Sequence, residues 1–275
     1  MAPPGPPVVD RFTDRLAASA ERAGSWLCVG LDPDPAKYPA GLEAEDTTEF
    51  LLDIVEATAD VACAYKPNAA FFEALGGYGH EALTEVIAAV PPGVPVVLDG
   101  KRNDIGNTAS KYAEAAFDEL GADAVTVTPY LGRDTVEPFS CYEDKGVFLL
   151  ARTSNPSAPD LQDLPTDAAH TPLWQAVATL AMREWNTNQN LGLVAGATYP
   201  DELAAIRTLC GDGVPLLIPG VGAQGGDAAT TLQHGGDGAG QFALVNVGRG
   251  IMYAGSGDGW LDQVRAAAGR FAADL

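Results

Sequence analysis

Charged residues follow two consecutive apolar segments of the chain, in the runs AYKPN and VVLDGKRND. The second run places Asp99 and Lys101 two residues apart, and such residues project from the same face of an extended strand. Asp104 follows three residues later, and Lys66 ends the apolar part of the first run. An ammonium group beside buried surface keeps its proton when carboxylates flank it. These four side chains therefore predict a site that delivers a proton.

A solvated turn is the plainer interpretation of the same charges. The chain has only five lysines, however, and two of them, Lys66 and Lys101, stand at the ends of consecutive predicted strands. In parallel α/β proteins the chemistry takes place at such strand ends. We therefore favour the catalytic interpretation.

A second candidate site lies in two glycine-rich segments, IPGVGAQGG at residues 218–226 and NVGRG at residues 246–250. The first contains G-x-G-x-x-G, which is typical of dinucleotide binding, but no acidic residue ends a strand about 20 positions later to hold a ribose. In a barrel, the loops after strands seven and eight commonly bind phosphate, because glycines let backbone N–H groups approach an anion. Arg249 can pair with the phosphate oxygens. We favour phosphate over a dinucleotide.

The elements that must position these residues alternate between strand and helix along the chain. Eight strands are predicted, each nearly continuous in apolar residues, which favours a parallel sheet that closes on itself. The predicted fold is α/β, a single (β/α)8 TIM barrel over residues 1–275. A helix over residues 8–24 covers the barrel bottom after a loose tail at residues 1–7.

Three predictions concern the connections. The helix beginning DTTEF has an acidic N-cap at Asp46, and NTASKYAEAAFDEL forms a helix that opens at Asn107 or Thr108. The loop over residues 156–171 is longer than most connections from strand to helix, so it is a candidate lid.

Composition restricts the classes of function. The formal charge of −21 argues against nonspecific nucleic-acid binding, which needs a basic surface. No apolar run approaches the roughly 18 residues of a membrane span, and the start resembles no signal peptide, so we expect a soluble, cytoplasmic protein. Four scattered cysteines and three isolated histidines form no metal motif.

The combination of LDPD, YKPN, DGKRNDIGNT, RTSNP, IPGVGAQGG and VGRG resembles the orotidine 5'-phosphate (OMP) decarboxylase family, in its longer bacterial and archaeal branch. The resemblance covers essentially the whole barrel. It implies decarboxylation of OMP to UMP, the last step of de novo pyrimidine synthesis, without cofactor or metal.

The resemblance also implies roles for individual residues. Lys101 protonates C6 of the pyrimidine, Asp99 holds it, and Lys66 contacts the ribose and fixes Asp99. The remaining substrate contacts are assigned to Asp32 for the ribose hydroxyls, Ser154 for the pyrimidine ring, and Pro219, Gln224, Gly248 and Arg249 for the phosphate end. A homodimer is implied, in which Asp104 and Thr108 reach the neighbouring subunit's active site.

Two other functions remain open on the sequence alone. One is a sibling barrel that acts on a sugar phosphate as a decarboxylase, synthase or epimerase and uses Mg²⁺ to stabilise an enediolate. Lys66 and the I-G-x-T after Asp104 favour the nucleotide enzyme. The other is a noncatalytic barrel that binds a phosphometabolite, although two lysines interleaved with carboxylates exceed what phosphate binding requires.

Overall fold

The computed structural model describes residues 10–222 and 225–275, and within them eight strands form one parallel sheet. The strands are β1 Leu27–Leu31, β2 Ala64–Pro67, β3 Val97–Arg102, β4 Ala124–Val127, β5 Gly146–Arg152, β6 Leu191–Ala195, β7 Leu216–Pro219 and β8 Ala243–Val247. Neighbours pair in the order β2-β1-β8-β7-β6-β5-β4-β3. Isolated parallel bridges from Tyr65 to Val96 and from Asn68 to Asp99 join the two outer strands, so the predicted barrel is confirmed.

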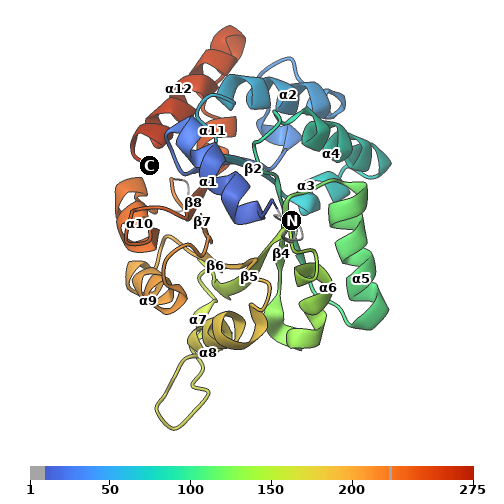
Figure 1. Cartoon of the computed structure of the whole chain (residues 1–275). Helices are drawn as coiled ribbons and strands as arrows, with labels where there is room; N and C mark the ends of the chain where they lie inside the picture. The colour runs from blue at the N-terminus through green and yellow to red at the C-terminus, as the bar shows by residue number, and fades with distance from the viewer. Residues whose placement is uncertain (1–9, 223–224) are drawn as a thin grey trace, which may run out of the picture.

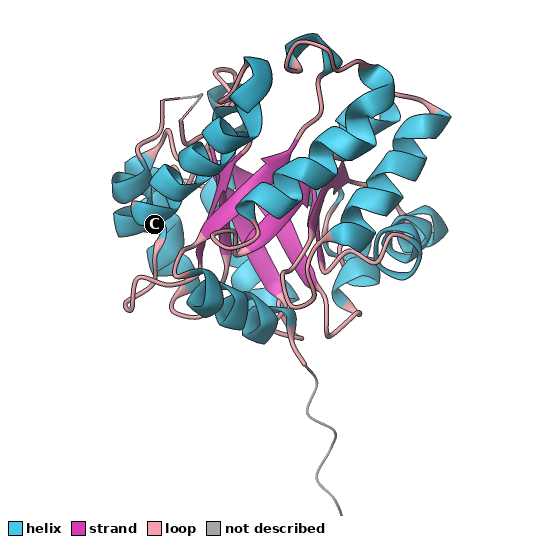
Figure 2. Ribbon diagram, turned by 90° about the horizontal axis from the view of Figure 1, so that it is seen from above, coloured by secondary structure: helices cyan, strands magenta, loops and turns pink. Residues whose placement is uncertain are grey.

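Helices surround this ring, as Figures 1 and 2 show. They are α1 Phe12–Ala23, α2 Thr47–Thr58, α3 Ala69–Glu73, α4 Gly77–Ala89, α5 Gly106–Glu114, α6 Glu137–Ser140, α7 Pro159–Gln162, α8 Leu173–Leu180, α9 Pro200–Cys210, α10 Ala228–Gly235, α11 Arg249–Met252 and α12 Trp260–Ala273. With the exception of α1 and α7, these helices pack apolar residues on the outer face of the strands in one large buried cluster. No helix in the described ranges combines the length and apolar character needed to span a bilayer.

Helix α1 lies across the bottom of the ring, as predicted, and ends at Gly24 with a left-handed φ of 63°. Its Phe12 ring packs edge-on against Phe148 of β5, with the ring centroids 5.8 Å apart. Gly146 makes room for this ring, because a Cβ at that position would lie 2.4 Å from a Phe12 carbon. Helix α1 therefore completes the apolar filling of the barrel from below.

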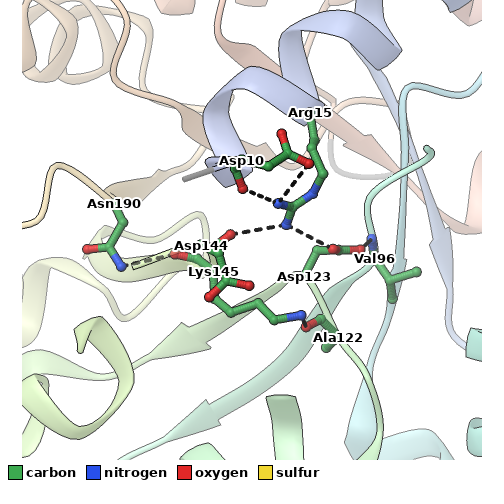
Figure 3. A network of polar contacts seen from close by, with 8 residues as sticks. All are labelled: Asp10, Arg15, Val96, Ala122, Asp123, Asp144, Lys145 and Asn190. Carbon is green, nitrogen blue, oxygen red and sulfur yellow. Dashed lines mark hydrogen bonds and ion pairs between the residues drawn. The ribbon is translucent and has the colours of Figure 1, made fainter. Parts of the chain in front are cut away.

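Arg15 fastens α1 to the strand starts at this end (Figure 3). Its guanidinium donates to Asp123 Oδ1 at 3.0 Å and to the Asp144 carbonyl at 3.1 Å. Asp123 in turn accepts the Val96 N–H at 3.0 Å. Asp123, Asp144 and Val96 lie one or two residues before β4, β5 and β3. These polar contacts therefore fix α1 to the amino ends of the strands, opposite the carboxyl ends.

Local predictions differ from the structure in four places. Helix α5 begins at Gly106, one residue before Asn107, and its predicted C-terminal part, Ala115–Glu119, is π-helical. Asp46 is the N-cap residue of α2, as predicted, but its carboxylate accepts the Glu43 N–H at 2.8 Å and makes no capping bond to α2. Helices α3 and α11 were not expected, because each is too short to show a periodic pattern.

The loop over residues 156–171 contains α7, and only the second half of the loop projects from the body (Figure 1).

Candidate active site

A cavity of about 490 Å³ opens at the carboxyl ends of the strands. Every strand contributes to its wall, directly or through the loop that follows it. The lining residues are Asp32, Lys66, Asn68, Asp99, Lys101, Thr126, Leu150, Thr153, Ser154, Asn155, Gln162, Val194, Leu217, Pro219, Gly220, Val221, Asn246, Gly248, Arg249 and Gly250.

Asp99 lies between two ammonium groups in this cavity. Its Oδ2 accepts from Lys66 Nζ at 2.9 Å and its Oδ1 accepts from Lys101 Nζ at 2.7 Å. Thr126 of β4 adds a third bond, because its hydroxyl donates to Asp99 Oδ1 at 2.8 Å. The side chains of Lys66 and Asp99 are 4% and 9% exposed, whereas that of Lys101 is 49% exposed. Both lysines line the cavity, and of the two Lys101 is therefore the more accessible to a ligand.

The two buried groups are held in their charged forms. Burial alone would raise the pKa of Asp99, but the attraction of Lys66 and Lys101 and their hydrogen bonds outweigh it, so this pKa lies below its ordinary value. Burial alone would lower the pKa of Lys66, but Asp99 and Asp32 outweigh it and raise that pKa. The array is an ion pair with a second cation at its outer edge.

Lys101 reaches Asp99 by a local distortion of β3. Its φ is 43°, in the left-handed region that a lysine seldom adopts, and the pairing with β4 shifts register between Leu98 and Arg102. The Lys101 N–H donates to Thr126 Oγ1 at 2.9 Å, which compensates for the missing strand bond. Thr126 therefore orients both Lys101 and Asp99. Backbone strain that neighbours hold in place in this way is common at functional sites.

Asp32 stands at the end of β1, next to β8 in the ring. The Tyr253 hydroxyl donates to its carbonyl at 2.8 Å, which fixes the turn. Burial raises the pKa of its carboxyl, and the attraction of Lys66 opposes this. Among the described residues, neither Asp32 Oδ1 nor Asn246 Oδ1 has a hydrogen-bond partner, although both are buried. Such acceptors suit the hydroxyl groups of a ligand.

The predicted phosphate residues Pro219, Gly248 and Arg249 line the same cavity, whereas Gln224 lies outside the described residues. In the described part of the glycine-rich loop, Gly220 and Gly222 have positive φ of 108° and 75°. Some of its backbone N–H groups already donate within the loop and are not free for an anion. The Gly222 N–H, for example, donates to the Gly226 carbonyl at 3.1 Å. The Arg249 guanidinium is therefore the main candidate for pairing with a phosphate at this end of the cavity.

Ser154 lines the wall just after β5, which lies opposite β1 in an eight-membered ring. Asp104 and Thr108 do not belong to the described wall of the cavity. Asp104 instead accepts the Ile105 N–H at 2.8 Å, and Thr108 is exposed on α5. Within one chain the structure therefore brings together all the described site residues except these two.

Sequence reasoning missed several polar residues of the cavity. Thr126 occurs in the apolar run AVTV, where an uncharged hydroxyl gives no signal of a site. Asn68, Asn246 and Gln162 were missed for the same reason. Asn246 and Gln162 do stand in segments already singled out, one in the strand before Arg249 and the other in the candidate lid. Among the described residues, no three His, Cys, Asp or Glu side chains cluster as a metal site would require.

Comparison with known proteins gives a consistent family. Residues 25–259 match the family model described as the orotidine 5'-phosphate decarboxylase / HUMPS family. The chain is 49% identical over 260 residues to an orotidine 5'-phosphate decarboxylase of Azoarcus sp. (strain BH72), covering 94% of this chain and 95% of the relative. It is 51% identical over 247 residues to that of Dechloromonas aromatica (strain RCB), covering 89% and 90%. The solved structure of the Leishmania donovani OMP decarboxylase superposes with a TM-score of 0.84 at 42% identity, over 96% of each chain.

Proposed function

The chain belongs to the orotidine 5'-phosphate decarboxylase / HUMPS family, and we propose that its cavity converts OMP to UMP through Lys66, Asp99 and Lys101. The observation that carries this assignment is the buried Lys66–Asp99 pair with the half-exposed Lys101 at its edge. The reaction belongs to pyrimidine biosynthesis, and relatives that share about half of the sequence are orotidine 5'-phosphate decarboxylases.

Lys66, Asp99 and Lys101 together meet the two requirements of this decarboxylation, which are stabilisation of negative charge on C6 and a proton for C6. When the bond from C6 to the carboxylate breaks, CO2 leaves and the electron pair stays on C6, where no adjacent group delocalises it. The Lys101 ammonium stabilises that charge and then transfers one of its protons to C6. Asp99 keeps Lys101 in place at 2.7 Å, and Lys66 keeps Asp99 in place from the buried side.

The shape of the ring suggests how the substrate lies. Asp32 and Arg249 follow the adjacent strands β1 and β8, so ribose hydroxyls at Asp32 and phosphate at Arg249 are neighbours. Ser154 stands across the ring after β5 and contacts the pyrimidine. Pro219, Gln224 and Gly248 complete the phosphate end, and Lys66 also contacts the ribose. Binding energy from the phosphate, remote from C6, then serves to orient the reacting carbon.

A homodimer accounts for the surface beside the cavity. Three large apolar side chains are exposed there, Ile105 at 61%, Tyr130 at 72% and Leu131 at 45%. They lie in two adjacent loops, because the Thr128 N–H donates to the Arg102 carbonyl at 2.9 Å. Exposed apolar groups of this size are typical of protein interfaces. Burying this surface against a second copy brings Asp104 and Thr108 of one chain to the cavity of the other.

A cytoplasmic location fits the cysteines of the chain. All four are free thiols, and Cys28 and Cys63 are buried in the barrel. A protein of this composition needs no oxidising compartment to fold.

The function is tested by incubating the purified protein with OMP in EDTA and following the ultraviolet absorbance change as OMP becomes UMP. We expect turnover that EDTA does not diminish. A folded preparation that leaves OMP unchanged refutes the assignment. OMP turnover that disappears in EDTA and returns with Mg²⁺ refutes the metal-free mechanism through Lys101.

A further inference from the structure

The buried guanidinium of Arg152, at the end of β5, holds the end of α7 against the barrel. Arg152 is 1% exposed, and its Nη1 donates to Gln162 Oε1 at 3.2 Å. The Arg152 Nη2 lies 3.5 Å from Asp163 Oδ2, and the Arg152 Cζ lies 3.9 Å from the ring centroid of Tyr199. A buried cation is costly unless it is paired and hydrogen-bonded, so these contacts fix Arg152 and the two residues it binds.

Gln162 passes this constraint on to the cavity wall. The same Oε1 accepts the Thr153 N–H at 2.9 Å, and Nε2 donates to Thr153 Oγ1 at 2.7 Å. Thr153 Oγ1 then donates to Asn155 Oδ1 at 2.7 Å. Gln162 and residues 153–155 all line the cavity. One amide side chain therefore binds both the backbone and the side chain of the residue directly before Ser154.

Gly196 confines this segment from the other side. The Gly196 N–H donates to the Arg152 carbonyl at 2.8 Å. A Cβ on Gly196 would lie 3.0 Å from both the N and the Cβ of Ser154, which is closer than such contacts normally allow. Residues 153–155 are therefore packed between Gly196 and Gln162, with little freedom to shift.

We propose that Gln162 is a positioning residue for segment 153–155, with Arg152 as its anchor. Helix α7 is then a fixed wall of the cavity, and only the part of the loop after Asp163 is free to act as a lid. The inference rests on the proposed function, in which Ser154 contacts the pyrimidine. Since Gln162 acts through Thr153, it affects placement of the base and leaves the phosphate end untouched.

The test is a double-mutant cycle between Gln162 and Ser154 in the full-length enzyme. Gln162→Met keeps the size of the side chain and removes its hydrogen bonds, so we expect kcat/KM for OMP to fall about 10- to 100-fold. Ser154→Ala combined with Gln162→Met should lie within about threefold of Ser154→Ala alone, because both changes remove the same contact. Inhibition by ribose 5-phosphate, which lacks the base, should change by less than about twofold in Gln162→Met.

Two further variants control for folding and chemistry. Gln162→Glu keeps an oxygen for Arg152 and for the Thr153 N–H, so it should recover most of the activity that Gln162→Met loses. Gln263→Met removes hydrogen bonds to the carbonyls of Ser256 and Gly259, far along the chain on α12, and should leave kcat/KM unchanged. If thermal unfolding shows that Gln162→Met does not fold, Gln162→Asn, whose shorter amide cannot reach Thr153, replaces it.

The result has clear alternatives. The proposal is overturned if the losses of kcat/KM from Gln162→Met and Ser154→Ala multiply in the double mutant. It is also overturned if Gln162→Met weakens ribose 5-phosphate inhibition as much as it lowers kcat/KM. A Gln162→Met enzyme whose kcat/KM is within about twofold of wild type overturns it as well. A wild-type protein without OMP turnover would instead refute the proposed function, so the two failures are distinguishable.

Discussion

Asp99→Asn should reverse the pH dependence of stability at high pH, because it leaves Lys66 buried without its ion pair. The Lys66 side chain is 4% exposed and lies 2.9 Å from Asp99 Oδ2, so this ion pair is the main compensation for its burial, to which the charge of Asp32 adds. Removing one partner of a buried pair costs about 3–5 kcal/mol. The substitution also leaves Lys66 and Lys101 near each other without an anion between them. A loss toward the upper end of that range is expected at pH 7.

Whether stability rises or falls with pH follows from the pKa of Lys66 in the wild type and in the variant. In the wild type this pKa is raised, so the contribution of Lys66 is complete below its unfolded pKa of about 10.4 and is lost as the pH rises through the folded value. In Asp99→Asn we expect burial to outweigh the remaining attraction of Asp32 and to lower the pKa of Lys66 below the unfolded value. The unfolded chain then binds more protons, and the mutant gains stability as the pH rises toward about 10.

Thermal or denaturant unfolding between neutral pH and pH 10 measures the effect. A loss of about 3–5 kcal/mol corresponds to a fall in Tm of roughly 6–20 °C for a chain of this size. Glu114→Gln is the control, because the Lys111–Glu114 pair is exposed at 64% and 45% and should change stability by less than about 0.5 kcal/mol. If Asp99→Asn and Glu114→Gln melt alike at pH 7, or the mutant does not gain stability with pH, the Lys66 reasoning is wrong.

Two other substitutions separate catalysis from binding. Lys101→Ala should reduce kcat by at least about 10²- to 10³-fold. Its Tm should stay close to that of the wild type, because the Lys101 side chain is half-exposed. A kcat within tenfold of wild type would mean that another group protonates C6. Arg249→Ala should weaken OMP binding by about 2–5 kcal/mol if its pair with the phosphate is desolvated, and should hardly affect the nucleoside orotidine; equal losses for both ligands would assign Arg249 a structural role.

The barrel could be predicted from the sequence because each of its units repeats the same pattern. A run such as GVFLLAR is apolar at nearly every position, and an amphipathic helix follows it, which leaves few other folds available. The exceptions are local. Asp46 carries the right side chain for a helix cap, but a competing turn at Glu43 takes its carboxylate, and no single-residue preference reveals that competition.

The site was predicted less completely, for a physical reason. Charged residues at strand ends stand out, so Lys66, Asp99 and Lys101 were found and do contact one another. A regular strand would place Lys101 and Asp99 on the same face, but in the structure the left-handed backbone at Lys101, held by Thr126, brings the two side chains together. A hydroxyl or an amide acquires its role only from the fold around it, and Gln162 likewise has no distinctive sequence context.

The shared site remains a prediction that two inactive variants can test together. Lys101→Ala and Asp104→Ala should each be nearly inactive as homodimers, because every site then lacks either its own lysine or the aspartate of its neighbour. In a mixed dimer one site collects both lesions, whereas the other combines an intact Lys101 with an intact Asp104 from across the interface. Random pairing makes half of the dimers mixed, each with one good site, so about a quarter of wild-type activity should return if the sites work independently. Subunit exchange is verified by mass-tagged chains, and a mixture of Lys101→Ala with Lys101→Met, which cannot complement, is the matched control. If exchange is complete and the mixture stays as inactive as that control, Asp104 does not act across the interface.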